Sequence, residues 1–235
     1  MADVSDLKKA LGTRAVDDFV SSGMCLGLGT GSTAIWAARR VGERLANGSL
    51  RDLHIVVTSL QTELEARALG IPLLTLNDAA LAGGLDLVID GADEVDPARN
   101  LIKGGGGALL REKIVAYASR KLLIIVDESK MSGRLCEHFA VPVEIVADSM
   151  APVTRGLREM GGEARLRIGL RKAGPVVTDL GNLLLDVSFA KPFDPPAFER
   201  EIKLLPGVLE NGIFTRNTPW LLIGHADGSI ERKDR

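Results

Sequence analysis

The sequence predicts an α/β protein in which a Rossmann-like domain with a mostly parallel sheet is joined to a smaller α+β domain. In the first half of the 235-residue chain, short apolar runs alternate with segments of helical period, which is the pattern of βαβ units. Glycine-rich or acidic turns follow two of these runs, as they do where ligands bind beyond the carboxyl ends of parallel strands. After Lys130 short strands outnumber helices, which indicates the second domain.

The first domain rests on apolar runs short enough for buried strands and on longer segments with apolar residues at helical spacing. A leading helix comes first, and helices then stand between strands, as parallel connections require. The expected strands are Met24–Leu28, His54–Thr58, Leu73–Thr75, Leu85–Ile89 and Leu122–Val126. The expected helices are Ser5–Phe19, Ala34–Leu45, Leu60–Leu69 and Leu109–Ser119.

The residues after Lys130 follow a β-α-β-β-β-α order, which is typical of a small α+β domain with an antiparallel sheet. The expected strands are Val143–Val146, Arg165–Ile168, Val176–Thr178 and Leu183–Val187, with helices at Pro152–Met160 and Pro195–Leu204. Two terminal runs, Ile213–Thr215 and Trp220–Ile223, fit either domain by periodicity alone.

Composition and charge narrow the classes of partner. Hydrophobic residues make up 46% of the chain and charged residues 26%, as in an ordinary soluble globular protein. The net charge is −2 and there is no block of basic residues, which argues against a nucleic-acid partner. Attraction for an anionic substrate must therefore be local, from groups such as Lys103, Lys130 and the N–H groups of loops.

The sequence predicts neither a metal nor a cofactor. Cys25 and Cys136 have no CxxC spacing and no neighbouring pair of histidines, so a disulfide framework or a zinc site is unsupported. His54, His138 and His225 are scattered outside the motifs below and are expected to be structural or surface residues.

No segment reads as a targeting or membrane signal. The N-terminal residues are polar and acidic, unlike a secretory signal. No apolar run approaches the ~20 residues that a membrane-spanning helix needs. The expectation is a cytoplasmic protein with no membrane contact.

One glycine-rich loop combines a cation, four glycines and a carboxylate. Gly104–Gly107 lie between Lys103 and a helical pattern that begins near Leu109. Glycines let the backbone approach a ligand closely, and a helix that starts after them points N–H groups and its positive dipole end at an anion. Glu112 falls near the first turn, within reach of chemistry at the loop. An ordinary helix start with an acidic residue is the alternative.

A second glycine-rich turn, Gly27–Thr33, stands between an apolar run and a helical pattern. Strand, glycine-rich turn and helix in this order form an anion-binding arrangement. No Gly-Lys-Ser/Thr closes the turn, so it is not a P-loop, and its glycine spacing differs from GxGxxG. Ser32 and Thr33 add hydroxyl donors for a phosphate, carboxylate or polyol. A tight turn with a Ser/Thr cap is the alternative.

An acidic segment, Asp90–Asp96, follows the apolar run Leu85–Ile89. At the carboxyl end of a strand, Asp90 and Asp93 could bind sugar hydroxyls or move a proton. The EF-hand pattern fails because the glycine and the final Glu are not at the required offsets. The alternative is a solvated acidic turn.

These motifs together resemble the three signature segments of the type A ribose-5-phosphate isomerase family. They are GLGTGST at 27–33, DGADEVD at 90–96 and KGGGGALLREK at 103–113, in the same order and with matching separations. Further similar segments are Asp127-Glu128-Ser129-Lys130, Val141-Pro142-Val143-Glu144, Val177-Thr178-Asp179 with Gly181-Asn182, and Leu205-Pro206-Gly207-Val208. The resemblance covers nearly the whole chain, from Leu7 to Gly224.

The resemblance implies an aldose–ketose isomerase that interconverts D-ribose 5-phosphate and D-ribulose 5-phosphate through an enediolate, in the non-oxidative pentose phosphate pathway. It implies Glu112 as the base, Lys103 with the loop N–H groups as stabiliser of the oxyanion, and Asp90 and Asp93 in hydroxyl binding and ring opening. Lys130 would complete the phosphate site, together with Lys8. The implied substrate-binding residues are Thr30, Gly31, Ser32, Thr33, Asp90, Gly91, Ala92, Asp93, Lys103, Gly104, Gly105, Gly106 and Lys130.

The resemblance also implies an organisation. Residues 1–130 with about 206–235 would form the Rossmann-like catalytic domain, and about 131–205 the small α+β domain. A homodimer or homotetramer is expected. Arg111 and Lys113 flank the base but diverge from it around the helix, so surface or subunit-contact roles are expected for both.

Two positions depart from the family pattern. Leu180 stands where the family usually has Asn, and Asn211 where it usually has His; both bear on local turns or interfaces rather than on the reaction.

Two other functions are alternatives: a non-catalytic sugar-phosphate sensor, and a related transferase or deaminase of the same fold group. A sensor would lack the base that Glu112 supplies, and a coenzyme A transferase would need a larger nucleotide pocket.

Overall fold

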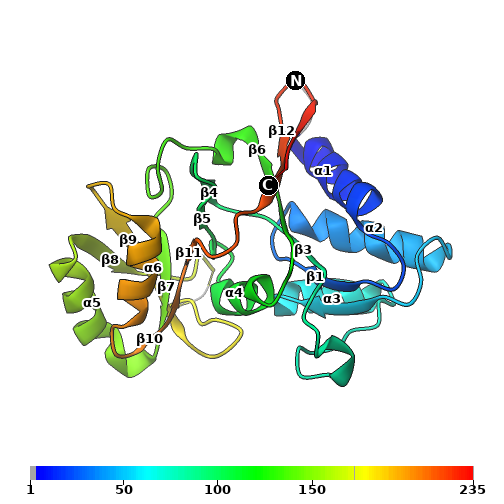
Figure 1. Cartoon of the computed structure of the whole chain (residues 1–235). Coiled ribbons are helices and arrows are strands. Elements are labelled where there is room, and N and C mark those ends of the chain that lie inside the picture. The colour runs from blue at the N-terminus through cyan, green and yellow to red at the C-terminus, as the bar shows by residue number, and fades with distance from the viewer. Residues whose placement is uncertain (1–3, 172, 235) are drawn as a thin grey trace. The chain divides into compact units, whose positions relative to one another are not determined.

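The computed structural model describes residues 4–171 and 173–234 and is shown in Figure 1. The chain divides into two compact units. Unit 1 comprises Met1–Gly91, Arg111–Lys130 and Asn217–Arg235, and unit 2 comprises Ala92–Leu110 and Met131–Arg216. The chain passes between the units four times, and two of these crossings, after Gly91 and after Leu110, lie in the sequence motifs described above.

Unit 1 is built on a six-stranded sheet in the order β13-β12-β6-β3-β1-β2. The neighbours from β12 to β2 are parallel, and β13 is antiparallel to β12. The strands are β1 (Cys25–Leu28), β2 (His54–Val57), β3 (Leu87–Asp90), β6 (Leu122–Asp127), β12 (Trp220–Gly224) and β13 (Ile230–Lys233). Buried Val, Ile and Leu dominate the central strands, as expected for parallel strands covered on both faces.

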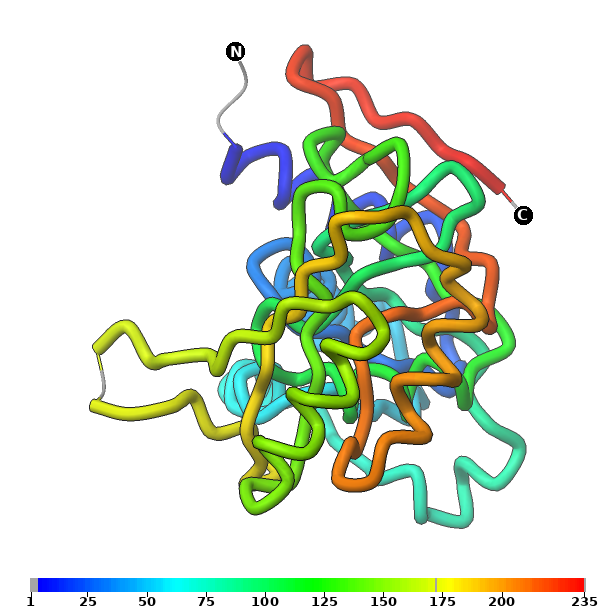
Figure 2. The backbone as a smooth tube through the Cα atoms, turned by 90° about the vertical axis from the view of Figure 1, so that its left-hand side faces the viewer, coloured from blue at the N-terminus to red at the C-terminus, as the bar shows by residue number. Residues whose placement is uncertain are grey.

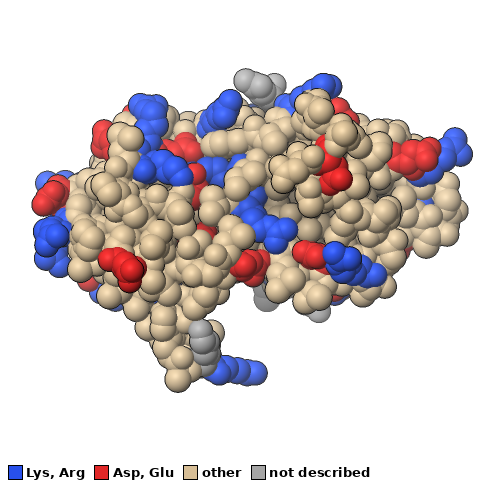
Figure 3. Space-filling model, turned by 90° about the horizontal axis from the view of Figure 1, so that it is seen from below, with Lys and Arg blue, Asp and Glu red and all other residues tan. Residues whose placement is uncertain are grey.

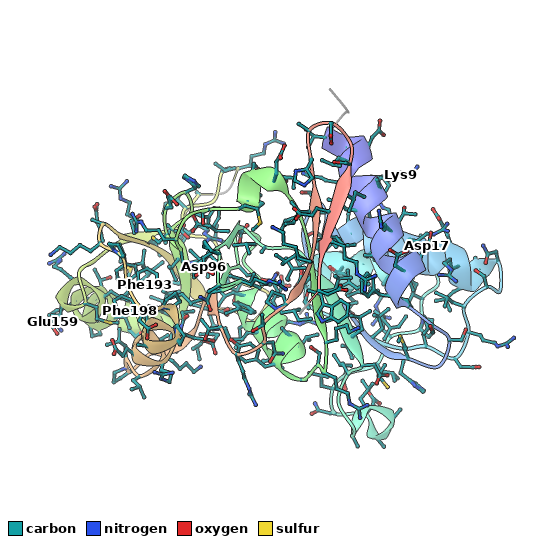
Figure 4. The ribbon with its side chains drawn as sticks, turned by 45° about the horizontal axis from the view of Figure 1, so that its top comes forward. Lys9, Asp17, Asp96, Glu159, Phe193 and Phe198 are labelled. Carbon is teal, nitrogen blue, oxygen red and sulfur yellow. The ribbon has the colours of Figure 1, made fainter. Side chains whose placement is uncertain are left out.

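Helices α1 (Val4–Phe19) and α2 (Ala34–Ala46) lie side by side against one face of this sheet (Figure 1). Their buried residues join Leu26, Leu28 and Ile89 of the strands in one core. Asp17 of α1, labelled in Figure 4, accepts two hydrogen bonds from Arg40 of α2 at 3.0 Å, which ties the helices together at the surface.

The other helices of unit 1 are α3 (Leu60–Ala68), the 3-10 turns η1 (Ala79–Leu81) and η2 (Glu128–Lys130), and α4 (Leu109–Tyr117), which begins in unit 2. Gly27 in β1 makes room for α4, because a Cβ there would lie 2.8 Å from Val115 Cγ1. Side chains alternate along a strand, so Gly27 faces the opposite side from Leu26 and Leu28. Helix α4 therefore covers the other face of the sheet.

Unit 2 contains an antiparallel sheet in the order β10-β7-β9-β8 and a small sheet in the order β11-β5-β4. The strands are β4 (Glu94–Val95), β5 (Leu101–Ile102), β7 (Val141–Ile145), β8 (Gly162–Leu166), β9 (Leu183–Phe189), β10 (Val208–Asn211) and β11 (Ile213–Phe214); the helices are η3 (Ala147–Ser149), α5 (Met150–Glu159) and α6 (Pro195–Lys203). Its core includes Phe193 and Phe198, labelled in Figure 4, whose rings stack with centroids 4.5 Å apart.

Between β8 and β9 the chain runs out and back as an arm, residues 167–171 and 173–182, yellow in Figure 2. Isolated antiparallel bridges join Ile168 to Pro175 and Val177 to Leu183. Leu170 on this arm is fully exposed, and Ile168, Val177 and Leu180 are also exposed. The arm is mostly tan in Figure 3, while Lys/Arg and Asp/Glu side chains are interspersed elsewhere on the face shown.

The predicted fold class is confirmed, and each expected helix is present within a few residues. Two expected strands, Leu73–Thr75 and Val176–Thr178, make only isolated bridges. Strands β4, β5, β10 and β13 were not expected; two of them have only two residues, too few to show an alternating pattern. Units 1 and 2 differ from the predicted domain ranges because β4, β5 and β11 pair with one another, which places 92–110 and 206–216 in unit 2.

Candidate active site

In unit 1, the turn after β1 is held by the aspartate at the end of β3. Oδ1 of Asp90 accepts hydrogen bonds from the backbone N–H of Thr30 at 3.0 Å and of Gly91 at 2.7 Å. Gly29 lies against this carboxyl group, and a Cβ there would be 2.1 Å from Oδ1. Asp90 is 0% exposed. The structure thus brings together the glycine-rich turn and the acidic segment, because β1 and β3 are parallel neighbours.

A row of hydroxyls after β2 supports the same turn. Oγ1 of Thr30 lies 2.6 Å from Oγ1 of Thr58, and Thr62 donates from its hydroxyl to the carbonyl of Gly29 at 2.8 Å. Ser59 caps α3 by accepting from the N–H of Thr62. Sequence reasoning missed these three supporting residues, although a Thr-Ser pair at the carboxyl end of a predicted strand was a readable signal.

Two lysines of unit 1 stand near the ends of its elements. Nζ of Lys8 donates to Oγ of Ser32 at 2.9 Å, so α1 supplies a cation to the Gly31–Thr33 segment. Lys130 is partly exposed in η2, directly after the carboxyl end of β6. The position of Lys130 follows from the parallel sheet, in which the carboxyl ends of β1, β3 and β6 share one edge.

Glu112 occupies the first turn of α4 and is 4% exposed. The next residue, Lys113, is also 4% exposed, and its Nζ lies 5.9 Å from the centroid of the Tyr117 ring. The expected surface role of Lys113 is therefore wrong. Ile114 of the same helix is 50% exposed. The buried face of α4 therefore includes the two charged side chains, while this apolar side chain faces outward.

In unit 2, the glycine loop is folded around Asp93. Its Oδ2 accepts a hydrogen bond from the N–H of Gly105 at 2.7 Å. A Cβ on Gly105 would lie 2.5 Å from Oδ1 of Asp93, so only glycine fits. Gly104 has φ +103° and Gly107 has φ +82°, values that favour glycine. Gly105 and Gly106 are exposed at the tip of the loop.

Lys103 enters this loop almost fully buried, at 2% exposure. Its backbone N–H donates to the carbonyl of Gly212 at 2.9 Å, and its Nζ lies 5.7 Å from the centroid of the Phe214 ring. Burying an ammonium group is costly unless it is compensated, so such a lysine is a candidate for function.

The other two carboxylates of the acidic segment have structural partners. Glu94 accepts hydrogen bonds from the N–H groups of Cys136, Glu137 and His138 at 2.6, 3.1 and 2.8 Å, which fixes that loop. Asp96, labelled in Figure 4, binds both the backbone N–H and the side-chain amide of Asn100 at 2.8 Å. Glu94 and Asp96 therefore hold loops outside the glycine-rich segments, whereas Asp90 and Asp93 hold the glycine-rich turn and the glycine loop themselves.

The described residues also bear on metal binding, cysteine reactivity and membrane crossing. No group of three or more His, Cys, Asp or Glu side chains in the described residues could hold a metal ion. Cys25 and Cys136 are free, and burial raises the pKa of the Cys136 thiol, which disfavours the reactive thiolate. Among the helices in residues 4–171 and 173–234, none combines the length and apolar character needed to cross a membrane.

The two departures from the family pattern fit their surroundings. Leu180 lies in a turn in which Gly181 donates to the carbonyl of Thr178 and Asn182 accepts from its N–H. Asn211 is fully buried, donates to the carbonyl of Glu199 at 2.9 Å and accepts from the N–H of Ile213 at 3.1 Å. Neither residue disturbs the turn or strand in which it stands.

The fold and these clusters define an α/β protein with anion-binding backbone and hydroxyl groups at the carboxyl ends of parallel strands, a class that binds small phosphorylated ligands. The family description "Ribose 5-phosphate isomerase A (phosphoriboisomerase A)" matches residues 54–228. Ribose-5-phosphate isomerase A of Treponema denticola is 46% identical over 97% of this chain and 99% of its own length.

Solved structures give the same result. A ribose 5-phosphate isomerase A from Methanocaldococcus jannaschii superposes with a TM-score of 0.91 at 41% identity, covering 99% of this chain and 100% of that one. A D-ribose-5-phosphate isomerase in complex with phospho-erythronic acid gives 0.93 at 37% identity, with 99% and 100% covered. The chain belongs to the ribose-5-phosphate isomerase A family.

Proposed function

We propose that this chain is a ribose-5-phosphate isomerase, which interconverts D-ribose 5-phosphate and D-ribulose 5-phosphate. The observation that carries the proposal is 46% identity to a ribose-5-phosphate isomerase A over 97% of this chain, together with the family match to residues 54–228. A relative at 37% identity has been solved with phospho-erythronic acid, a sugar-phosphate acid.

The reaction moves one proton between adjacent carbons. In the direction from ribose, a base removes the proton on C2 of the open-chain aldehyde, and negative charge develops on O1 as the enediolate forms. The same base returns the proton to C1, and a proton passes from O2 to O1, which leaves the ketone at C2. We assign the base to Glu112, because its buried carboxylate stands in the first turn after the glycine loop.

The other groups bind and stabilise. Lys103 and the N–H groups of Gly104 and Gly106 are assigned to the enediolate oxygen, because preorganised donors stabilise charge that appears in the transition state; the N–H of Gly105 donates to Asp93. Asp90 and Asp93 are assigned to the sugar hydroxyls and to ring opening. Thr30–Thr33 and Lys130, with Lys8 beside Ser32, are assigned to substrate binding.

The test is turnover of ribose 5-phosphate to ribulose 5-phosphate by the purified protein, measured with and without exhaustive EDTA treatment. We expect activity in both conditions, because proton transfer between adjacent carbons can use Lys and backbone donors alone. No turnover would overturn the proposed function. Loss on EDTA treatment with recovery on adding Mg²⁺ or Zn²⁺ would overturn metal independence alone.

The cellular location and the oligomeric state are also proposals. We place the protein in the cytoplasm, where its two free cysteines would stay reduced. We expect a homodimer or homotetramer, and the exposed apolar side chains on the arm, including Leu170, supply a surface for self-association. Light scattering coupled to size exclusion measures the mass directly, and a monomer at working concentration would contradict this.

A further inference from the structure

An arginine at the base of the arm reaches the glycine loop of unit 2. Nη1 of Arg167 donates to the carbonyl oxygens of Gly104 and Gly105, both at 3.0 Å. The arginine comes from a segment more than 60 residues away in sequence. No role in the reaction has been assigned to Arg167 above.

The guanidinium group is itself held in place. Its Nε donates to Oδ2 of Asp186 at 2.9 Å, and Nη2 donates to Oδ1, which makes the paired geometry in which both partners are oriented. The backbone of Arg167 is fixed too, since its N–H donates to Leu184 and its carbonyl accepts from Val176. The side chain is 15% exposed. Arg167 is therefore a preorganised group and not a mobile surface cation.

The geometry of the peptide units relates the two carbonyl groups that Arg167 contacts to the N–H groups on the other side of the loop. In a trans peptide the N–H points away from the carbonyl of the same unit. The peptide whose carbonyl is on Gly104 has its N–H on Gly105, which donates to Asp93. The peptide whose carbonyl is on Gly105 has its N–H on Gly106, at the exposed tip. A cation at the carbonyl ends polarises both peptides and strengthens the N–H groups as donors.

We infer that Arg167, oriented by Asp186, is a positioning residue for the isomerase reaction: it fixes and polarises the peptides that present the N–H of Gly105 to Asp93 and the N–H of Gly106 to the enediolate oxygen. The inference rests on the proposed role of the loop as the oxyanion site. Arg167 does not touch the substrate in this account. It acts on charge that develops in the transition state and therefore on kcat more than on KM.

The experiment compares Arg167→Gln with Arg165→Gln, a matched control two residues earlier. Arg165 is a cation of the same kind, but it is 79% exposed and pairs only with Glu163 in the described chain. For Arg167→Gln we expect kcat to fall about 10- to 100-fold, the scale of a misplaced catalytic group, with KM within about threefold of wild type. Arg165→Gln should match wild type in both constants.

Phospho-erythronic acid provides a readout that a merely structural role would not move. Its carboxylate carries negative charge like the enediolate, so its inhibition constant should rise in Arg167→Gln by about the factor by which kcat/KM falls. Asp186→Asn keeps Arg167 but orients it less firmly. It should lower kcat and raise the inhibition constant in the same way, by a smaller factor. Arg167→Lys should recover part of kcat, because one ammonium can reach one carbonyl.

The outcomes separate the inference from the function on which it rests. A normal kcat in Arg167→Gln, or a raised KM with kcat unchanged, would overturn the positioning role while wild-type turnover stands. No turnover by the wild type would overturn the proposed function itself. If Arg167→Gln fails to fold, Asp186→Asn decides: a kcat defect with KM preserved supports the role, and kinetics like those of Arg165→Gln overturn it.

Discussion

Three ionisable side chains of the candidate site, Asp90, Lys103 and Glu112, are between 0% and 4% exposed. Charged groups are rarely buried to this extent without partners, because desolvation is costly. Under the proposed assignment, Lys103 and Glu112 would act more strongly on a developing charge than exposed side chains do, because they lie away from bulk water. The two predictions at this scale test the separate roles assigned to Glu112 and to Lys103.

Glu112→Gln should lose most turnover and keep nearly normal substrate affinity. The amide keeps the shape of the side chain but cannot accept the proton, and general base catalysis contributes ~10²–10⁴-fold. Steady-state kinetics with ribose 5-phosphate measure both constants. Glu43→Gln, on a 59% exposed residue of α2, is the control and should behave as wild type. A variant that kept more than about a tenth of wild-type kcat would require another base.

Lys103→Ala and Lys130→Ala should differ in which constant they change. Buried Lys103 is assigned to charge that appears mainly on the enediolate, so kcat should fall about 10²–10³-fold. Lys130, partly exposed after β6, is assigned to the phosphate, which is held alike in both states, so KM should rise with kcat little changed.

Lys103→Met controls for the space that Lys103→Ala leaves, because methionine keeps most of the length without the charge. It should show the same kcat defect. The reverse pattern, with a KM defect at Lys103 and a kcat defect at Lys130, would exchange the two assignments.

At the scale of the element, the candidate site depends on glycines at strand ends. Gly29→Ala should destabilise the protein by roughly 1–3 kcal/mol, the usual cost of overpacking. The new Cβ would lie 2.1 Å from Oδ1 and 2.6 Å from Cα of Asp90, so backbone as well as side chain must move. Turnover should fall with it, because Asp90 is displaced.

Chemical denaturation of Gly29→Ala, with Gly83→Ala as the control, measures the change in the free energy of unfolding. Gly83 is an exposed glycine whose added Cβ would meet only Nη2 of Arg120, at 4.0 Å, and the change should stay within about 0.5 kcal/mol of wild type. Equal stabilities for the two variants would mean that β1 and β3 shift apart without cost.

Sequence reasoning succeeded where a pattern is local. The parallel strands were predicted because each is a continuous apolar run, and the three motifs because glycines, carboxylates and hydroxyls stand together in the chain. It failed where partners are distant: β4 and β5 are defined by pairing with β11 rather than by their own two-residue patterns. Arg167 gives no local sign of its contact with the glycine loop, and the burial of Lys113 depends on how α4 is turned.

At the scale of the whole molecule, the proposed catalytic residues are distributed over two units, and two of the four joints between these units, Gly91–Ala92 and Leu110–Arg111, lie close to them in sequence. Asp90 and Asp93 stand on either side of the first joint, and Glu112 follows the second. Substitutions at these joints therefore act on both units, and unfolding need not be a single two-state transition. Stability comparisons are best made on variants confined to one unit.

His225 offers such a comparison, with a pH dependence whose sign is defined. Its Nδ1 lies 2.7 Å from Oε2 of Glu128, and its Nε2 lies 3.5 Å from Oε2 of Glu231; all three belong to unit 1. The hydrogen bond to Glu128 raises the pKa of His225, and the same bond, with that from the N–H of Ala226, lowers the pKa of Glu128. Both shifts favour the charged pair in the folded state.

The pair should therefore stabilise the fold only inside a pH window. The contribution of His225 is full below its unfolded pKa, near 6.5, and is lost as the pH rises through its raised folded pKa. That of Glu128 is full above its unfolded pKa, near 4.5, and is lost as the pH falls through its lowered folded pKa. His225→Gln should lower Tm by roughly 1–2 °C between about pH 5 and 6.5, since the pair is exposed.

Thermal unfolding of His225→Gln across pH 4–9, beside His138→Gln, tests this window. His138 is an exposed histidine of unit 2 whose imidazole pairs with no carboxylate in the described chain, and glutamine keeps its backbone N–H bond to Glu94, so its variant should follow the wild-type curve at every pH. The Tm difference for His225→Gln should close at alkaline pH, where the imidazole of the wild type is neutral. A Tm difference that grew with pH would contradict the charged pair. It would mean that neutral His225 stabilises the packing of β12 and β13 against the end of β6, and that the charge of the imidazole is irrelevant.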